Sequence, residues 1–377
     1  MAPGVTEQEL VSRAKPQVSE VLVADPHPSA RSGHARRATP ARLIELLEMR
    51  IGRFSGLVVW LAFIVAFGLV EPTTFLTSTT ATSIAGGQAV TLVLALGLVI
   101  GMSAGQFDLS IGANLTLGSV VCLVLMSEHR WNPVLAAVVA VLVCTIGGGL
   151  MALLVVVVGV DSPIAGLAVS SVLLAFSEWI TGGQYVGPAP RGFQDIAASR
   201  PLGIPILLIY AIGAALVVWY VLEHTPVGRR VHATGANPET SRLVGIATYR
   251  YVAGSLLATG FLCGIAGVLL AAQFGSVDPS VGTPYLLPTF AACFLGSTQI
   301  KPGRFNVWGT AVAIYLLATA AKGFELAGSA SWISDMFNGA ALVAAVGLAA
   351  LFRRRRAAKL NRATTARTAN GTSGPAD

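Results

Sequence analysis

Long apolar segments alternate with short polar ones over most of this chain, and the pattern predicts a bundle of membrane-spanning helices. A helix needs roughly 20 apolar residues to cross the hydrocarbon core of a bilayer. Segments of about this length, with boundaries good to a few residues, occupy residues 54–71, 82–103, 109–127, 133–158, 162–181, 204–223, 251–272, 284–299, 305–323 and 333–352. We therefore expect an all-α integral membrane protein with about ten transmembrane helices.

Composition supports this class of protein. Hydrophobic residues make up 54% of the chain and charged residues only 11%, with a mean hydropathy of +0.70. These values exclude an enzyme with a large water-soluble core. Four cysteines lie in apolar segments without metal-ligand spacing, and the histidines lie in tails and loops, so no metal site or cofactor is expected.

Basic residues determine the expected orientation. With a cytoplasmic N-terminus, most of the 25 Lys and Arg residues fall on the cytoplasmic side, as the positive-inside rule requires. The residues left outside are Arg130, Arg191, Arg200 and Lys322. Both termini are therefore expected in the cytoplasm, with disordered tails at 1–45 and 353–377 around a transmembrane domain at 46–352. The net charge of +7 then suits contact with membrane lipid rather than with nucleic acid.

The pattern Asp-x-Ser-x-Gly occurs twice inside apolar segments, at residues 108–112 and 278–282. A carboxylate near the bilayer centre costs roughly 2.5–3.5 kcal/mol, so it normally lines a polar path or fixes a broken helix. The first copy follows predicted span two and the second follows span seven. An odd number of spans between equivalent points inverts one half against the other, so we expect two inverted five-span halves, as in many transporters.

Residues around these two copies are candidates for the transport pathway. Residues 103–110 hold too many small and polar groups for a lipid-facing helix, so a helix break is expected there. The predicted pathway residues are Gln106, Phe107, Asp108, Ser110, Asn114, Asp278 and Ser280. Each aspartate either contacts the transported solute or caps a helix, and both roles stay open. For Gln88 and Asn338, also inside apolar spans, interhelical hydrogen bonding is favoured.

The longest predicted cytoplasmic connection, residues 228–246, contains the signals of a short helix. Asn237 is suited to the N-cap, Pro238 to the first turn and Glu239 to the positive end of the helix dipole. The helix should close at about Gly245. It has little apolar face, so docking against a partner protein is more plausible than packing on its own chain.

Three passages together resemble the permeases of ribose-type sugar importers of the ABC superfamily. Residues 105–112 are similar to the family pattern Gly-Gly-Ile-Asp-Leu-Ser-Val-Gly, with Gln106 and Phe107 as departures. Residues 228–246 contain Gly-Arg, Ala-x-Gly-x-Asn and Arg-Leu-x-Gly-Ile. Residues 295–310 are similar to a third family passage, Leu-Gly-Gly-Thr followed by Gly-Thr. With the span count, the resemblance covers about residues 54–352.

The resemblance implies a permease subunit in the bacterial cytoplasmic membrane that forms the pathway for a ribose-like monosaccharide. It implies cytoplasmic ATP-binding subunits, an extracytoplasmic sugar-binding protein and a second permease chain, identical or closely related. The coupling loop to the ATPase would carry Gly235, Asn237, Glu239 and Arg242. Consistent with this, the chain has no GxxxxGK[ST] phosphate loop of its own.

Three alternatives remain at this stage. Ten spans in two inverted halves also describe ion-coupled secondary transporters, although such proteins do not need a coupling loop. A branched-chain amino-acid ABC permease is a related possibility, but those permeases lack the Asp-Leu-Ser element. An intramembrane enzyme would use Asp108 and Asp278 as a catalytic acid and base.

Overall fold

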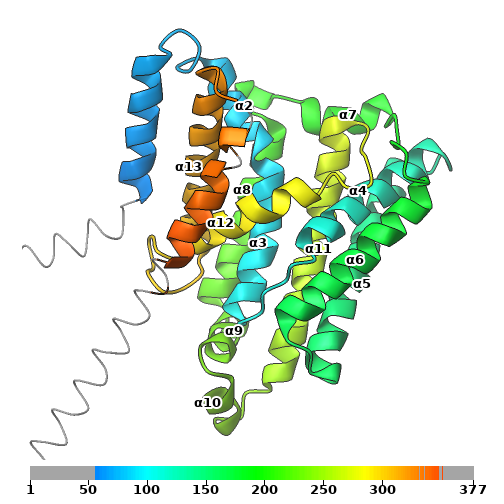
Figure 1. Ribbon diagram of the computed structural model, residues 1–377. Helices are drawn as coiled ribbons and strands as arrows, with labels where there is room; N and C mark the ends of the chain where they lie inside the picture. Colours follow the sequence, from blue (N-terminus) through cyan, green and yellow to red (C-terminus); the bar gives the residue numbers. More distant parts are fainter. Residues whose placement is uncertain (1–55, 331, 335, 348–349, 351–377) are drawn as a thin grey trace, which may run out of the picture. The chain divides into compact units, whose positions relative to one another are not determined.

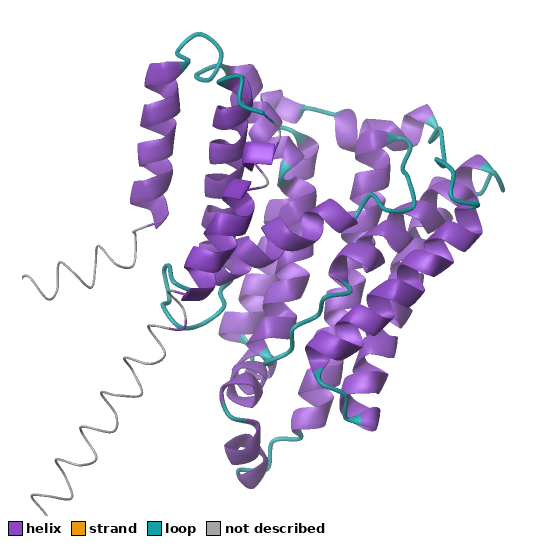
Figure 2. Ribbon diagram, viewed as in Figure 1, coloured by secondary structure: helices purple, strands orange, loops and turns teal. Residues whose placement is uncertain are grey.

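A computed structural model describes residues 56–330, 332–334, 336–347 and 350, all within the unit Leu47–Asp377 (Figures 1 and 2). Both predicted tails, 1–45 and 353–377, lie outside the described residues. The described residues are helical apart from loops and one isolated β-bridge between Val186 and Val277. The labelled helices are α2 (Ser78–Gly87), α3 (Ala89–Ser103), α4 (Ile111–Ser127), α5 (Pro133–Ala152), η1 (Leu153–Val158), α6 (Ser162–Thr181), α7 (Arg191–Ala198), η2 (Pro201–Gly203), α8 (Ile206–His224), α9 (Pro226–Ala236), α10 (Pro238–Leu243), α11 (Thr248–Phe274), η3 (Thr283–Tyr285), α12 (Leu286–Gly296) and α13 (Val307–Leu326).

The prediction of a multi-pass α-helical membrane protein is confirmed. Among the described residues, six helices are long and apolar enough to cross a bilayer: Ser78–Ser103, Pro133–Val158, Ser162–Thr181, Ile206–His224, Thr248–Phe274 and Val307–Leu326. Shorter apolar helices occupy Gly56–Val70, Ile111–Ser127 and Thr283–Gly296. These coincide with the first nine predicted spans to within a few residues, and helical residues 336–347 overlap the tenth.

The helix break predicted around residues 103–110 is present. Helix α3 ends at Ser103, and α4 begins only at Ile111. Gly105 has a φ of +83°, which a residue with a side chain resists. The structure adds two irregularities that were not predicted: Gln88, with φ −93° and ψ 0°, separates α2 from α3, and residues 153–158 form a π-helix.

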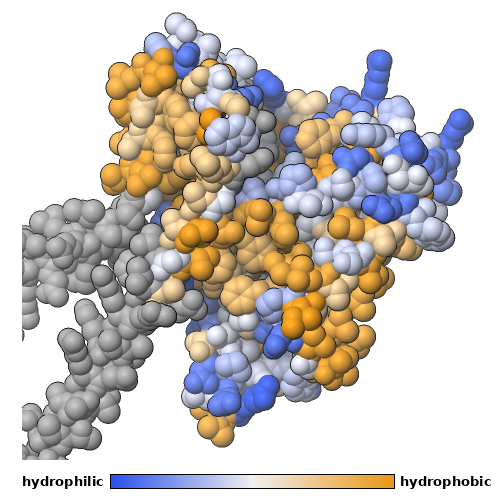
Figure 3. Space-filling model, viewed as in Figure 1, coloured by the Kyte–Doolittle hydropathy of each residue, from blue (hydrophilic) through white to orange (hydrophobic). Residues whose placement is uncertain are grey.

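Helices α3 and α11 form the centre of the described bundle. In their most apolar windows 72% of residues are buried, against 28% for α5, α6 and α8, which leaves the latter helices to face lipid. Helix α11 packs on α4 and α5, while α3 packs on α12 and α13. Figure 3 shows apolar surface over the helix Gly56–Val70 and over α5, with hydrophilic surface gathered near α7 and near α9 and α10.

Glycine allows a close contact between α5 and α11. A Cβ atom at Gly148 would lie 2.5 Å from the Leu256 carbonyl oxygen, and one at Gly260 would lie 2.5 Å from that of Cys144. Small residues are the usual means by which helices approach closely in lipid, where the hydrophobic effect does not drive their association. This contact therefore fixes the position of α11 in the bundle.

Candidate functional site

The first Asp-x-Ser-x-Gly copy forms a tight turn between α3 and α4. The Oδ1 atom of Asp108 accepts a hydrogen bond from the Ser110 amide at 2.8 Å and another from the Ser110 hydroxyl at 2.6 Å. Asp108 is 1% exposed, and Ser110 is fully buried. Ser110 is the N-cap residue of α4, so the carboxylate holds the chain in position to enter that helix.

The second copy forms the same turn after α11. The Oδ1 atom of Asp278 accepts from the Ser280 amide at 2.7 Å and from the Ser280 hydroxyl at 2.6 Å. Here the serine is exposed and the aspartate half-buried. The repeated sequence pattern therefore produces a repeated hydrogen-bond geometry in two different environments.

The glycines that end the two copies pack against each other. A Cβ atom at Gly282 would lie 2.1 Å from the Gly112 carbonyl oxygen, so bare backbone meets bare backbone there. Thr116 bridges the contact, because its hydroxyl accepts from the Gly282 amide at 2.9 Å and donates to the Gly112 carbonyl at 3.1 Å. Two segments that are 170 residues apart in sequence thus meet at one point between α4 and η3.

The segments that lead into the two turns come from opposite ends of the bundle, although the turns themselves meet at Gly112 and Gly282. The segment leading into the first turn lies against α9, where a Cβ atom at Gly235 would come within 2.2 Å of the Ser103 carbonyl oxygen. The segment leading into the second turn pairs with the loop before α7, since the amides and carbonyls of Val186 and Val277 bond to each other. Helices α9 and α7 lie at opposite ends in Figure 1, and these ends are called the α9 face and the α7 face below.

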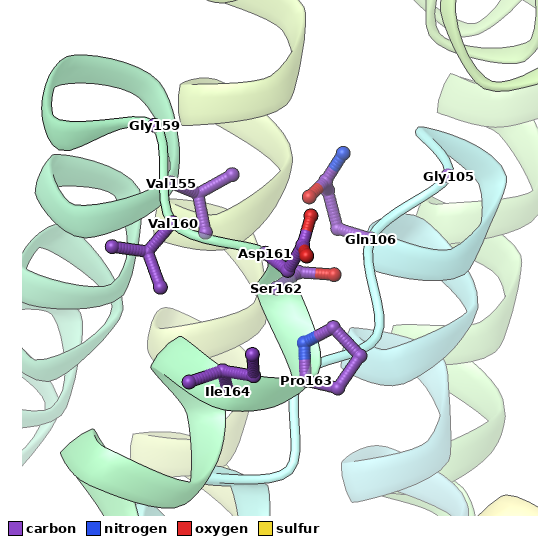
Figure 4. Close-up of a pocket in the computed structure, with 9 residues that line it drawn as sticks. All are labelled: Gly105, Gln106, Val155, Gly159, Val160, Asp161, Ser162, Pro163 and Ile164. Atoms are coloured by element: carbon purple, nitrogen blue, oxygen red, sulfur yellow. The ribbon is translucent and has the colours of Figure 1, made fainter.

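Two predicted pathway residues border cavities on either side of the broken segment. Gln106 lines an open cavity of about 650 Å³ with Asp161 and Ser162 from the start of α6 (Figure 4). The Ser162 hydroxyl accepts from the Phe107 amide at 3.0 Å, which ties the break to α6. The Phe107 ring stacks on Phe294 of α12 with centroids 6.1 Å apart.

A second cavity, of about 640 Å³, opens at the α9 face. Phe107, Gly235, Arg229, Arg304 and His232 are among its lining residues. Burial, and then the positive charge of Arg304, lower the pKa of His232 to about 4, so its imidazole is neutral at pH 7. In the part of the chain that the structure describes, no three His, Cys, Asp or Glu side chains gather as metal ligands.

Asn114 lies away from both cavities. Its Nδ2 donates to the Cys144 carbonyl at 3.0 Å, and the Cys144 thiol lies 3.2 Å from the Asn114 carbonyl as a donor. The residue is 1% exposed between α4 and α5. The structure thus brings Asn114 together with α5 rather than with Gln106 and Phe107.

The predicted coupling loop contains the expected short helix, α10, at the α9 face, while Gly235 lies in α9. The Asn237 side chain caps α10 by accepting from the Thr240 amide at 3.0 Å, and the chain turns at Gly245 with a φ of +82°. Glu239 is exposed, and the Arg242 Nε donates to the Thr248 hydroxyl at 2.9 Å. At the end of α10, Leu243 is 87% exposed. A large exposed apolar residue at a helix end suits contact with another protein.

Sequence reasoning missed several residues of this region. Asp161, Ser162 and Thr116 were not predicted, although Asp161-Ser162-Pro163 carries a helix-start signal between two apolar runs. Their contacts with residues 106–112 and 282 join segments far apart in sequence. No local pattern indicates such pairings.

Comparison with known proteins places the chain in a family. The family model described as branched-chain amino acid transport system / permease component matches residues 80–346. The autoinducer 2 import system permease protein LsrD of Salmonella typhi is 30% identical over 289 residues, which cover 75% of this chain and 86% of that protein. LsrD of Escherichia coli K12 and of Shigella flexneri are each 30% identical over 293 residues, covering 75% of this chain and 87% of theirs. No solved structure matches the chain.

These matches confirm the resemblance to importer permeases of the ABC superfamily and exclude the enzyme and secondary-transporter alternatives. The chain belongs to the family of branched-chain amino acid transport system permease components and is the membrane-spanning permease subunit of an ABC importer, not an enzyme.

Proposed function

We propose that two copies of this chain, or one copy and a close relative, form the pathway of an ATP-driven importer for a small neutral polyhydroxylated solute such as a ribose-like monosaccharide. The α9 face lies in the cytoplasm and binds two ATP-hydrolysing subunits. The α7 face receives the solute from an extracytoplasmic binding protein. Exposed Arg229, Arg230 and Arg250 near α9 support this orientation, because basic residues concentrate on cytoplasmic ends.

The observation that carries the proposal is the contact of α9 with the broken segment. Gly235 lies so close to Ser103 and Gly105 that no side chain fits between them. A displacement of α10 by an ATPase would therefore pass through α9 to the segment that holds Gln106, Phe107 and the Asp108 turn. Movement of that segment alters both cavities beside it, as alternating access requires.

Two inverted halves are the second part of the proposal. Three observations support it. The Asp108 and Asp278 turns share one hydrogen-bond geometry, and the segments that lead into them come from opposite faces. Helices α3 and α11, which precede the two turns, pack against each other. In this arrangement each aspartate and serine pair holds a broken helix, the first pair buried within the bundle and the second where water reaches Ser280, and Gln106 and Phe107 border the inner end of the pathway.

A neutral solute agrees with the chemistry of the pathway. The Oδ1 atoms of both aspartates accept hydrogen bonds from their own serines, which gives each carboxylate a role within its turn. The relatives are named for autoinducer 2, whereas the family description names branched-chain amino acids. Uptake assays should therefore include D-ribose, autoinducer 2 and L-leucine, and we expect D-ribose or autoinducer 2 to be imported.

Coupling is tested with the assembled transporter in proteoliposomes. Glu239→Ala with Arg242→Ala should abolish ATP-dependent uptake while membrane insertion and dimer formation are unchanged. Because Arg242 also bonds to Thr248 within the chain, Thr248→Val is the matched control, since it breaks the same internal bond and leaves both charges in place. Unchanged uptake in the double variant, or equal loss in the control, would contradict a coupling role for these side chains.

A further inference from the structure

A cavity near the α7 face contains hydrogen-bonding groups that the local structure does not use. It has a volume of about 310 Å³ and lies between the α2–α3 junction, η3, α12, α13 and helical residues 336–347. Gln88, Tyr285 and Asn338 line it from three of these elements, and Thr91 adds a hydroxyl. None of the described residues that line it is charged.

Gln88 and Asn338 were expected to hydrogen-bond between helices, but in the described part of the chain neither amide side chain has a partner. Gln88 occupies the junction between α2 and α3, where the backbone departs from helical angles inside a membrane span while its amide and carbonyl still bond to Ile84 and Leu92. The Tyr315 hydroxyl donates to the Ala85 carbonyl at 3.3 Å and ties α13 to α2 beside the break. Irregular backbone at membrane depth is tolerated where it is buried in protein or lines a polar cavity.

Tyr285 reaches this cavity because of the second Asp-x-Ser-x-Gly copy. The turn at Asp278 leads into Gly282, whose carbonyl accepts from the Tyr285 amide at 3.1 Å in the first turn of η3. The cavity is thus attached to one of the two turns on which the proposed mechanism depends.

Another cavity, of about 520 Å³, leads from the 310 Å³ cavity toward the α7 face. The two cavities share Gly87, Gln88, Ala318 and Ala321. Ser83, Ser329 and the ion pair of Lys322 with Glu325 line the larger of the two. Helix α13 begins beside the loop that borders the cavity at the α9 face, so Lys322 and Glu325, near its C-terminal end, lie toward the α7 face. Polar groups therefore continue from this end of α13 to Gln88.

We propose that the 310 Å³ cavity is the solute-binding site of the outward-facing permease, and that Gln88, Tyr285 and Asn338 select a neutral polyol by hydrogen bonds to its hydroxyl groups. Amide and phenol groups both donate and accept, as hydroxyl recognition requires. The volume lies at the lower end of the roughly 300–1,000 Å³ range of small-molecule sites, which suits a single monosaccharide. This inference rests on the proposed function and adds the residues that choose the solute.

The first test measures selectivity in the assembled transporter with its binding protein. Gln88→Leu and Asn338→Leu keep most of the side-chain volume and remove the amide. Uptake of D-ribose should fall about tenfold in each. The ratio of D-ribose uptake to monodeoxy-ribose uptake should fall toward one for at least one such analogue. The reason is that the hydroxyl absent from the analogue is the one that the removed amide would bind.

Leu317→Met is the matched control, since it changes the same cavity wall at nearly constant volume without changing hydrogen-bonding capacity. It should leave the preference between D-ribose and its deoxy analogues intact. If the amide variants also keep the wild-type preference, the assignment of Gln88 and Asn338 is overturned. A role in packing alone would lower uptake of all these sugars equally.

The second test does not depend on uptake. The four native cysteines are buried, so Ala318→Cys introduces an accessible thiol while leaving both amides in place. A hydrophilic methanethiosulfonate reagent added from outside should label it, and D-ribose should slow labelling at least about threefold. Labelling that none of a panel of neutral monosaccharides slows would overturn the site.

Failure of the proposed function gives a different result. If the wild-type transporter, with active ATPases, imports no neutral monosaccharide, the proposed solute class is wrong and this assignment falls with it. If the wild type imports D-ribose while the amide variants keep their preference and the Ala318→Cys thiol is unprotected, only this assignment is wrong.

Discussion

The two aspartates make the same hydrogen bonds in different surroundings, so their replacement should have unequal effects. Asp108→Ala removes the acceptor of two bonds from Ser110, a fully buried residue. Each buried donor left without a partner costs about 1–3 kcal/mol. The Ser110 hydroxyl can rotate toward another acceptor, so we expect a loss of about 2–4 kcal/mol in the free energy of unfolding. Asp278→Ala should cost less than about 1 kcal/mol, because water reaches the exposed Ser280.

The asparagine variants separate hydrogen bonding from charge. In Asp108→Asn the amide oxygen can accept both bonds from Ser110, so a turn-holding role predicts nearly wild-type stability and transport. The free energy is measured by SDS-induced unfolding in mixed micelles, and transport by uptake in proteoliposomes. Equal loss of stability in the two alanine variants would refute the argument from burial. Loss of transport in Asp108→Asn at unchanged stability would show that the carboxylate charge itself acts on the solute or on a proton.

Two further predictions concern the α9 face. Asn306 is 6% exposed, its Oδ1 accepts from the Gly309 amide at 2.7 Å, and its Nδ2 donates to carbonyls that precede it. Asn306→Ala should therefore lower the free energy of unfolding by about 3 kcal/mol, and Asn306→Asp should lower it by less. The pKa of His232 is about 4 in the folded protein, below the roughly 6.5 of a histidine in an unfolded chain. As pH falls, the unfolded state therefore binds a proton first, and the free energy of unfolding decreases between about pH 6.5 and pH 4. At pH 5 we expect a loss of roughly 1 kcal/mol, allowing for solvent at this half-buried side chain, and a flatter pH profile in His232→Gln.

The sequence predicted the helices well because each span is specified locally. An Asn-Pro pair determines where α5 and α10 begin, an apolar run carries α5 across the membrane, and Gly245 marks the turn after α10. The break before α4 was also predictable, since small and polar residues cluster there. The Asn237 cap was identified for the same reason.

The missed features depend on residues distant in sequence. Gln88 interrupts a run of apolar residues, and from the sequence its side chain was expected to hydrogen-bond to another helix. In the structure this side chain lines a cavity instead. The Val186–Val277 bridge and the contact of Thr116 with Gly282 join segments from different halves. Asn114 was predicted as a pathway residue because it is polar inside an apolar run, and the structure shows its side chain bonded to Cys144 of α5. Periodicity identifies a helix face but not the neighbour it packs against.

The meeting of Gly112 with Gly282 has a mechanical consequence. Bare backbone meets bare backbone at this crossing and the Thr116 hydroxyl spans it, so we expect α4 and the η3–α12 segment to rotate against each other about this point. Helix α4 is about 25 Å long, so a rotation of about 10° with the crossing held still displaces its far end by about 4 Å. A pivot of this kind converts a small angular change at the crossing into a displacement of several ångströms at the far end of α4.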